Sequence, residues 1–255
     1  MSKIHLEFDD KIAEMRLDNP AKLNALTSAM LEAIEKYCAE IERREDVRAL
    51  LLTAEGNKVF CSGADISDWS QLSPFEFARQ WIREGHRIFD RLARLSIPTI
   101  AVLNGHAFGG GLELAATCDI RVMHPTATLV LPETGVGIVP GWSGTQRLVR
   151  LLPESVVKEM ALFGRRLSAS RAEQFGFVAE VSETPYDKAV EIANSMVKTS
   201  PYATVVVKQM IHAGVGEDAA ALLEAMGGGM IASSMDKAEG VEAFREKRKP
   251  NFKGQ

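Results

Sequence analysis

The amino-acid sequence predicts an α/β protein whose C-terminal region is helical. Strand-like segments alternate with helical patterns in the first part of the chain, and from Thr145 onward nearly every segment has helical spacing. The 255 residues are 46% apolar, which is enough to bury a full core without disulfides or metals. Neither an internal repeat nor a low-complexity linker separates independent domains. We therefore expect an α/β core over residues 1–200 and a helical region over residues 201–255.

The strands are predicted from short apolar segments. Alternating apolar and polar residues predict a hairpin of two strands, Ile4–Phe8 and Ile12–Leu17. Further strands are expected at Ala49–Thr53, Thr99–Leu103, Ile120–Met123 and Thr128–Val130. A glycine-rich turn follows Leu103, so the chain is expected to pass there from a strand to a helix.

Apolar residues at helical spacing predict the helices. Two long helices are expected at Ser28–Ile41 and Phe75–Leu95, with Ile97-Pro98 ending the second, and another helix starts near Gly110. The later helices are expected at Gln146–Leu152, Ser155–Phe163, Ala169–Gln174, Tyr186–Lys198, Ala203–Ala213, Asp218–Ser233 and Lys237–Arg245.

Charge and cysteine content argue against several classes of protein. With 30 basic and 34 acidic residues the net charge is −4, which disfavours a nucleic-acid surface. Cys38, Cys61 and Cys118 are odd in number and lack zinc-ligand spacing, so we expect neither a metal site nor a disulfide framework. The sequence has no apolar signal core and no membrane-length apolar run, so we expect a cytoplasmic protein with no membrane partner. A cleaved organelle presequence would leave no trace here.

The segment Asn104–Leu114 contains three adjacent glycines, Gly109 to Gly111, at a strand-to-helix junction. The first N–H groups of a helix have no intrahelical acceptor, so the N–H of Gly110 is a candidate donor to a developing oxyanion. Glu113 lies about one turn into the helix, and its side chain leans toward the same space. The alternatives are a solvated glutamate at a helix start and a glycine turn that serves packing alone. Neither GxGxxG nor GxxxxGK[ST] spacing is present, so a phosphate-binding loop is disfavoured.

Two further loops carry candidate groups. Val59–Ile66 is a small-residue turn that supplies a possible second N–H donor, and its alternative is an ordinary loop in which Asp65 caps a helix. Glu133 follows the predicted strand Thr128–Val130, a frequent position for catalytic carboxylates. Alone it would more often be a surface residue. Paired with Glu113 beside an anion-binding turn, it becomes a candidate general acid or base.

Together these motifs resemble the crotonase family, the enoyl-CoA hydratase/isomerase superfamily, almost from end to end. The matching segments are Leu17–Pro20, Leu23–Leu26, Phe60–Ile66, Gly109–Ala115 with Cys118-Asp119, Pro132-Glu133, Gly144–Leu148 and Glu239–Phe252. The resemblance implies a core that is a spiral of ββα turns and a helical C-terminal region that forms trimers, commonly paired into hexamers. It also implies a thioester oxygen held by the N–H groups of Ala64 and Gly110, and a water positioned by the N–H of Gly141.

The resemblance further implies an acyl-CoA substrate, with the CoA as part of the substrate and no separate cofactor. Its CoA-binding positions correspond here to Lys22, Leu23, Ala25, Ala64, Asp65, Ile66, Ser67, Gly110, Phe244 and Lys247. Ser67 stands where a lysine is frequent in the family, which weakens the case for a phosphate contact there. Phe244 and Lys247 would reach the CoA from their own or a neighbouring subunit.

The carboxyl pair points to one reaction within this diverse family. Hydratases resemble this sequence in having glutamate at both matching positions, Glu113 and Glu133, whereas double-bond isomerases typically keep only the second. We therefore expect syn addition of water to a trans-2-enoyl-CoA, as in fatty acid degradation. The alternatives are an isomerase, a specialised hydroxyacyl-CoA dehydratase, and an idle module that binds CoA or RNA.

The acyl group is less clear from the sequence. Trp142 and Ser143 replace the small residues usual in hydratases, so Trp142 either packs against a neighbouring helix or reshapes the acyl pocket. The aromatic residues of the segment 68–83 are expected to cover the acyl chain, or else to belong to the core; they are Trp69, Phe75, Phe77 and Trp81.

Overall fold

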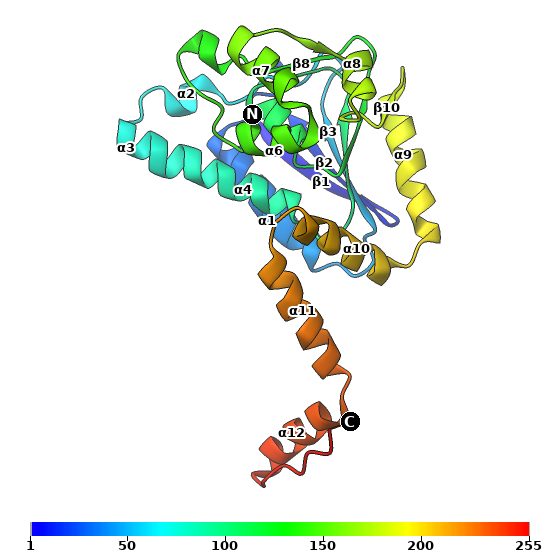
Figure 1. Ribbon diagram of the computed structural model, residues 1–255. Helices are drawn as coiled ribbons and strands as arrows, with labels where there is room; N and C mark the ends of the chain where they lie inside the picture. The colour runs from blue at the N-terminus through cyan, green and yellow to red at the C-terminus, as the bar shows by residue number, and fades with distance from the viewer. Residues whose placement is uncertain (1, 255) are drawn as a thin grey trace. The chain divides into compact units, whose positions relative to one another are not determined.

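The computed structural model describes residues 2–254, without the side chains of Val197 and Ala220. The chain forms two compact units, the first ending at Pro201 and the second starting at Tyr202 (Figure 1). No helix of the described residues is both long and apolar enough to cross a membrane.

Two sheets build the first unit. The six-stranded sheet has the order β1 (Lys3–Asp9), β2 (Ile12–Asp18), β3 (Ala49–Ala54), β5 (Thr99–Leu103), β7 (Ile120–Met123) and β10 (Glu180–Val181). The four-stranded sheet has the order β4 (Val59–Cys61), β6 (His106–Phe108), β8 (Thr128–Val130) and β9 (Leu167–Ser168). Among the strands that the structure describes, only β1 with β2 and β8 with β9 pair antiparallel.

The strand order shows a repeating turn. β3, β5 and β7 lie side by side and parallel in the larger sheet, and β4, β6 and β8 do the same in the smaller one. Each turn therefore contributes one strand to each sheet before the chain moves on by one strand. This arrangement confirms the predicted spiral of ββα turns.

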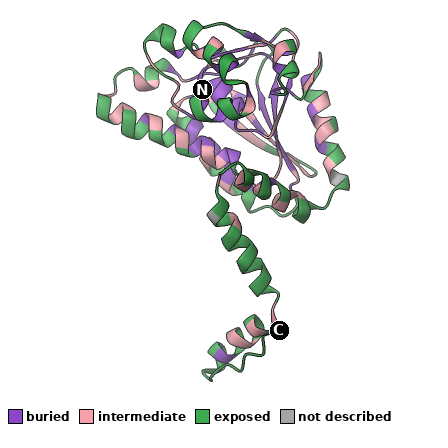
Figure 2. Cartoon of the chain, in the orientation of Figure 1, coloured by how far each residue is buried: buried purple, intermediate pink, exposed green. Residues whose placement is uncertain are grey.

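Both faces of the larger sheet are covered, which explains its uninterrupted apolar strands. All residues of β3 and β5 are buried, whereas the edge strands β1 and β10 are mostly not, and Figure 2 shows the buried residues in purple. Because successive side chains of a strand point to opposite faces, Leu50 and Leu52 face the main core while Leu51 faces a second cluster. Helix α9 (Pro185–Ser195) completes that second cluster with Ala189 and Ala193.

The remaining helices of the first unit are mostly short. They are α1 (Ser28–Glu42), α2 (Ile66–Trp69), α3 (Pro74–Glu76), α4 (Arg83–Ala93), α5 (Gly110–Ala115), α6 (Gly144–Leu151), α7 (Glu154–Phe163) and α8 (Ala169–Gln174). Short 3₁₀ segments occur at Pro20–Lys22, Glu133–Val136 and Met196–Lys198.

The prediction of one regular α-helix over Phe75–Leu95 is wrong. A π-helical segment, Phe77–Ile82, separates α3 from α4. Periodicity does not detect this change, since one widened turn shifts the apolar pattern by a single residue. Such segments are often found at functional sites.

The short strands are the other correction. β6 lies in the segment that the sequence assigned to a turn, and β9 and β10 interrupt the region predicted as helical. Strands of two or three residues are too short to show an alternating pattern, so the neighbouring strand decides them. The hairpin and the strands predicted at residues 49–53, 99–103, 120–123 and 128–130 are confirmed.

The second unit contains α11 (Ala219–Ala232), α12 (Met235–Glu246) and nearly all of α10 (Pro201–Gly214). The tail after α12 folds back on that helix. Arg248 forms two hydrogen bonds with Glu239, and the N–H of Asn251 donates to the same carboxylate. Phe252 lies against Gly240.

Candidate active site

The glycine turn before α5 brings the chain close to Glu133. Gly109 has φ +51° and ψ −124°, a backbone conformation that side-chain-bearing residues rarely adopt. A Cβ on Gly109 would also lie 2.7 Å from Oε1 of Glu133. Both the turn and the carboxyl group therefore require glycine here.

Glu113 is the fourth residue of α5 and is 2% exposed. Its Oε1 accepts hydrogen bonds from the N–H of Trp142 at 2.8 Å and from the N–H of Gly144 at 2.6 Å. Gly144 begins α6, so the positive end of that helix faces the carboxyl group. Burial raises the pKa of Glu113 above its ordinary value, and the amides of Gly144, Trp142 and Gly141 oppose that rise. Glu113 is thus a buried carboxyl whose ionised form is specifically solvated.

Glu133 has the opposite surroundings. It begins the 3₁₀ segment after β8 and is 7% exposed. Its Oε2 is buried without a hydrogen-bond partner among residues 2–254. Burial, reinforced by the negative charge of Glu113, raises the pKa of Glu133 to about 7. Amide N–H groups thus support the ionised form of Glu113, whereas among residues 2–254 Oε2 of Glu133 has no such support.

The two carboxyl groups line one cavity of about 160 Å³. Gly63, Ala64, Gly109, Gly110 and Gly141 contribute backbone to its wall. The structure thus brings together the predicted acid–base pair and the predicted amide donors. Among the described residues no group of three or more His, Cys, Asp or Glu side chains could hold a metal ion.

The N–H of Ala64 is directed by a β-bridge with Leu26. Leu26 donates its N–H to the carbonyl of Gly63 at 2.8 Å, and Asp65 donates to the carbonyl of Leu26 at 2.8 Å. Because successive amides of an extended segment point to opposite sides, the N–H of Ala64 points away from Leu26. In the part of the chain that is described, it donates to no residue.

The N–H of Gly110 lies beside that of Ala64. A Cβ on Gly63 would be 3.4 Å from the amide nitrogen of Gly110, and a Cβ on Gly110 would be 3.6 Å from that of Ala64. Gly110 is the first residue of α5, so its N–H has no intrahelical acceptor, and no bond from it to another described residue is present. Two adjacent unpaired amides thus face the cavity that holds the carboxyl pair.

Trp142 both packs against a neighbouring helix and lines the cavity, the two alternatives that the sequence left open. The indole packs against α4, with its ring centroid 5.2 Å from that of Phe89, and it also lines the cavity. Three of the four aromatic residues expected over the acyl chain, Trp69, Phe77 and Trp81, line the cavity as well. For the fourth residue, Phe75, the expectation is wrong, because its side chain is 66% exposed and is not part of the cavity wall.

Six of the predicted CoA-binding residues form one surface beside the cavity. Lys22 donates to Asp65 at 2.6 Å and to Ser67 at 3.3 Å. Its ammonium group therefore lies beside position 67, where other family members frequently have a lysine. The hydrogen bond from Lys22 lowers the pKa of Asp65. Asp65 also caps α2 through the N–H of Ser67. The exposed apolar residues of this surface are Leu23 and Ile66, and Ala25 lies buried between the loops.

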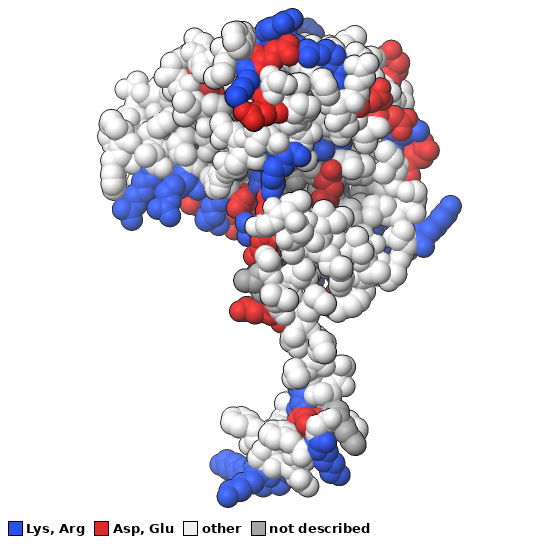
Figure 3. Space-filling view, in the orientation of Figure 1, with Lys and Arg blue, Asp and Glu red and all other residues white. Residues whose placement is uncertain are grey.

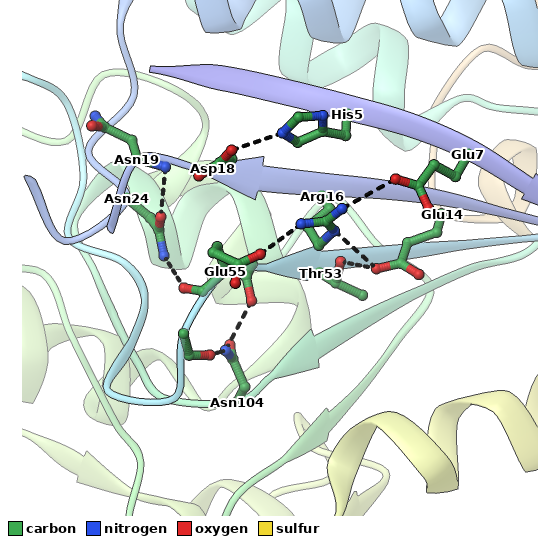
Figure 4. A network of polar contacts seen from close by, with 12 residues as sticks. His5, Glu7, Glu14, Arg16, Asp18, Asn19, Asn24, Thr53, Glu55 and Asn104 are labelled. Atoms are coloured by element: carbon green, nitrogen blue, oxygen red, sulfur yellow. Dashed lines mark hydrogen bonds and ion pairs between the residues drawn. The ribbon is translucent and has the colours of Figure 1, made fainter. Parts of the chain in front are cut away.

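Asparagine side chains hold the loop of residues 19–25 in place (Figure 4). Asn24 accepts the N–H of Asn19 and donates to the carbonyls of Glu55 and Val59. Asn19 donates to the carbonyl of Ala25. Through these bonds the two asparagines fix the loop that carries the predicted CoA-binding residues Lys22, Leu23 and Ala25. Phe244, 86% exposed, and Lys247 belong to the second unit.

Three comparisons with known proteins agree. The family profile described as Enoyl-CoA hydratase/isomerase matches residues 7–255. A short-chain-enoyl-CoA hydratase of Clostridium acetobutylicum is 37% identical over 253 residues, covering 98% of this chain and 97% of the relative. A probable mitochondrial enoyl-CoA hydratase 2 of Arabidopsis thaliana is 36% identical, covering 96% and 83%. The crystal structure of an enoyl-CoA hydratase from Bacillus anthracis superimposes with a TM-score of 0.80 at 33% identity and 99% coverage of both chains.

Proposed function

The chain belongs to the enoyl-CoA hydratase/isomerase family, and from that premise we propose how its buried carboxyl pair hydrates a trans-2-enoyl-CoA. Its activity is that of an enoyl-CoA hydratase. The observation that carries the proposed mechanism is the joint position of Glu113 and Glu133 in one cavity with two unpaired amides. Loss of enoyl-thioester absorbance on mixing the protein with crotonyl-CoA tests it.

Attack of water on the β-carbon of an enoyl thioester moves negative charge to the thioester oxygen. The amides of Ala64 and Gly110 are the proposed donors to that oxygen, because they lie side by side and have no other acceptor among the described residues. Since these donors belong to a β-bridge and a helix start, they need no rearrangement when the charge develops.

Glu113 is the proposed base. Its ionised form accepts two amide N–H groups on Oε1, which leaves Oε2 to take a proton from water. Gly141 also lines the cavity, and its N–H is the proposed second contact to the water, beside Oε2 of Glu113. Water oriented in this way would add its hydroxyl group to the β-carbon.

Glu133 is the proposed acid. Burial raises its pKa to about 7, so a substantial share of the protein carries this proton at neutral pH, and Oε2, which has no partner among the described residues, is free to deliver it to the α-carbon. After the addition, Glu113 holds the proton taken from water and Glu133 is ionised. Transfer of one proton from Glu113 to Glu133 then restores the starting state. No electrons change hands, and the proposal requires no cofactor beyond the CoA of the substrate.

The CoA moiety is proposed to lie along Lys22, Leu23, Ala25, Asp65, Ile66 and Ser67. Lys22 is the cation of this surface that could pair with a phosphate, by leaving Asp65. Exposed Leu23 and Ile66 offer apolar contact to the adenine or pantetheine part. Contributions from Phe244 and Lys247, a cytoplasmic location and the absence of a nucleic-acid partner stay predictions from the sequence.

Activity is expected to decline as the pH rises above about 7. The working form has Glu133 protonated, and burial raises its pKa to about 7, so each further pH unit should deplete the donor about tenfold. The measurement is kcat/KM for crotonyl-CoA hydration across neutral and alkaline pH. A profile that stays flat well into the alkaline range would contradict the assignment of Glu133 as the acid.

The chain is also proposed to form trimers or dimers of trimers, as family members are typically oligomeric. Helix α11 supports this, because its apolar residues Leu223, Met226, Met230 and Ile231 are exposed, and none of its described side chains is buried. Light scattering in solution is expected to give three or six times the mass of one chain. The mass of a single chain would contradict the proposal.

A further inference from the structure

The indole of Trp142 is immobilised at one end of the cavity. Its Nε1–H donates to the carbonyl of Trp81 at 3.2 Å, and its backbone N–H donates to Glu113. Its ring centroid lies 5.1 Å from that of Trp81 and 5.2 Å from that of Phe89. With 2% of its surface exposed, the side chain has no room to swing aside. It therefore behaves as a wall.

Two glycines make the space for this wall. A Cβ on Gly85 of α4 would lie 2.2 Å from Nε1 of Trp142, so no side chain is tolerated under the indole. A Cβ on Gly110 would lie 3.0 Å from Cε3 and Cζ3 at the opposite edge. The indole thus extends from α4 to the amide that is proposed to hold the thioester oxygen, and it fills the volume beside that amide.

The cavity is small. At about 160 Å³ it is roughly half of the ~300 Å³ at the lower end for pockets that take drug-sized ligands. Pro132, Val136, Ile138 and Val139 also line it, and the two valines are exposed. A short acyl group fits such a space, whereas a long chain needs a continuation.

A second direction is closed by Ile82 and Gly141. A Cβ on Gly141 would lie 2.4 Å from Cδ1 of Ile82, so these two residues are in tight contact. Beyond them is a groove of about 760 Å³ whose wall includes arginines of the π-helical segment and α4. Figure 3 shows basic side chains gathered along these helices. An alkyl chain entering that groove would meet charged, hydrated groups, which disfavours it.

We propose that Trp142 closes the acyl end of the active site and restricts this hydratase to short-chain enoyl thioesters. The proposal rests on the proposed hydratase function and names its substrate class. Without the indole, the space above Gly85 joins the cavity, and the acyl group gains an apolar continuation bounded by Trp81 and Phe89. The backbone amide at position 142 is kept by any substitution other than proline.

The experiment measures kcat/KM for crotonyl-, hexenoyl-, octenoyl- and decenoyl-CoA. In the wild-type protein the value for decenoyl-CoA is expected to be at least about 100-fold below that for crotonyl-CoA, since one surplus methylene costs about 10-fold or more. Trp142→Ala is expected to raise the decenoyl-to-crotonyl ratio at least about 10-fold. Trp142→Phe keeps an aromatic ring and should shift the ratio in the same direction by less, and it serves if the alanine variant does not fold.

Phe89→Leu is the matched control. Phe89 packs on the same indole but is not part of the cavity wall, so this variant loosens the core without shortening Trp142. Its ratio is expected to stay within about 3-fold of the wild-type ratio. The inference is overturned if wild-type protein turns over decenoyl-CoA as well as crotonyl-CoA, or if neither Trp142 variant changes the ratio more than Phe89→Leu does. Absence of crotonyl-CoA hydration by wild-type protein would instead overturn the proposed function.

Discussion

Glu113→Gln and Glu133→Gln are each expected to lower kcat for crotonyl-CoA hydration by about 10²- to 10⁴-fold, the range of a positioned acid or base. Glutamine keeps the size of each side chain but cannot take or give the proton. At position 113 the amide oxygen can still accept the N–H groups of Trp142 and Gly144, so the geometry is retained while the base is lost. The kcat of the double variant should be little below that of the less active single variant, because the two carboxyl groups act as one unit. Near-normal turnover in either single variant would contradict the mechanism.

A stability measurement separates lost chemistry from lost structure. The folded protein raises the pKa of Glu133 to about 7, above the ordinary value near 4.5. Between these values the folded state binds one more proton than the unfolded state, so this group's contribution to stability is full below about 4.5 and is lost as the pH rises through about 7. Glutamine at this position cannot ionise, so the Glu133→Gln variant does not lose this stability as the pH rises. Its free energy of unfolding above pH 7 should therefore equal or exceed that of the wild type, by up to a few kcal/mol as an order of magnitude.

Gly110→Pro is expected to lower kcat by about 10²- to 10³-fold, the cost of losing one oxyanion donor. Proline is tolerated at the first position of a helix, and the N–H that it removes is the one proposed to hold the thioester oxygen. The measurement is single-turnover hydration of crotonyl-CoA.

Gly110→Ala is the control for that substitution. It adds the same Cβ, which lies 3.0 Å from the indole of Trp142, but keeps the N–H. Activity of the alanine variant is expected to exceed that of the proline variant at least about 10-fold. Equal activities of the two would show that the N–H of Gly110 contributes nothing and that only the crowding of Trp142 matters.

Local patterns identified much of the site before the fold was known. Helix geometry made Glu113 a candidate, since a residue one turn into a helix faces the N–H groups at its start, but it left a solvated glutamate equally open. Gly110 followed from the same reasoning. For Glu133 the residues alone favoured a surface position, and for Ala64 they gave only a weak signal. The order of motifs along the chain, through the family resemblance, pointed to both residues and to the CoA-binding loop.

Other features have no local signal. The π-helical segment Phe77–Ile82 and strand β6 depend on neighbours distant in sequence, which compete successfully with weak local preference. The two amides on Glu113 come from a loop some 30 residues away, and the contact of Gly109 with Glu133 joins two turns of the spiral. These contacts form only when the spiral brings one turn against the next.

The sequence by itself determined the spiral α/β architecture, the glycine turn and the identity of the two glutamates, because each depends on short-range geometry or on the order of motifs. Only the tertiary structure gave the two glutamates different surroundings, because Oε2 of Glu133 is buried without a partner among residues 2–254 whereas two amide N–H groups solvate Glu113. It also showed that Trp142, which the sequence left between packing and the acyl pocket, both packs against α4 and lines the cavity. Desolvation, hydrogen bonding and cavity volume are properties of atoms that folding brings together from separate segments, and no single segment contains them.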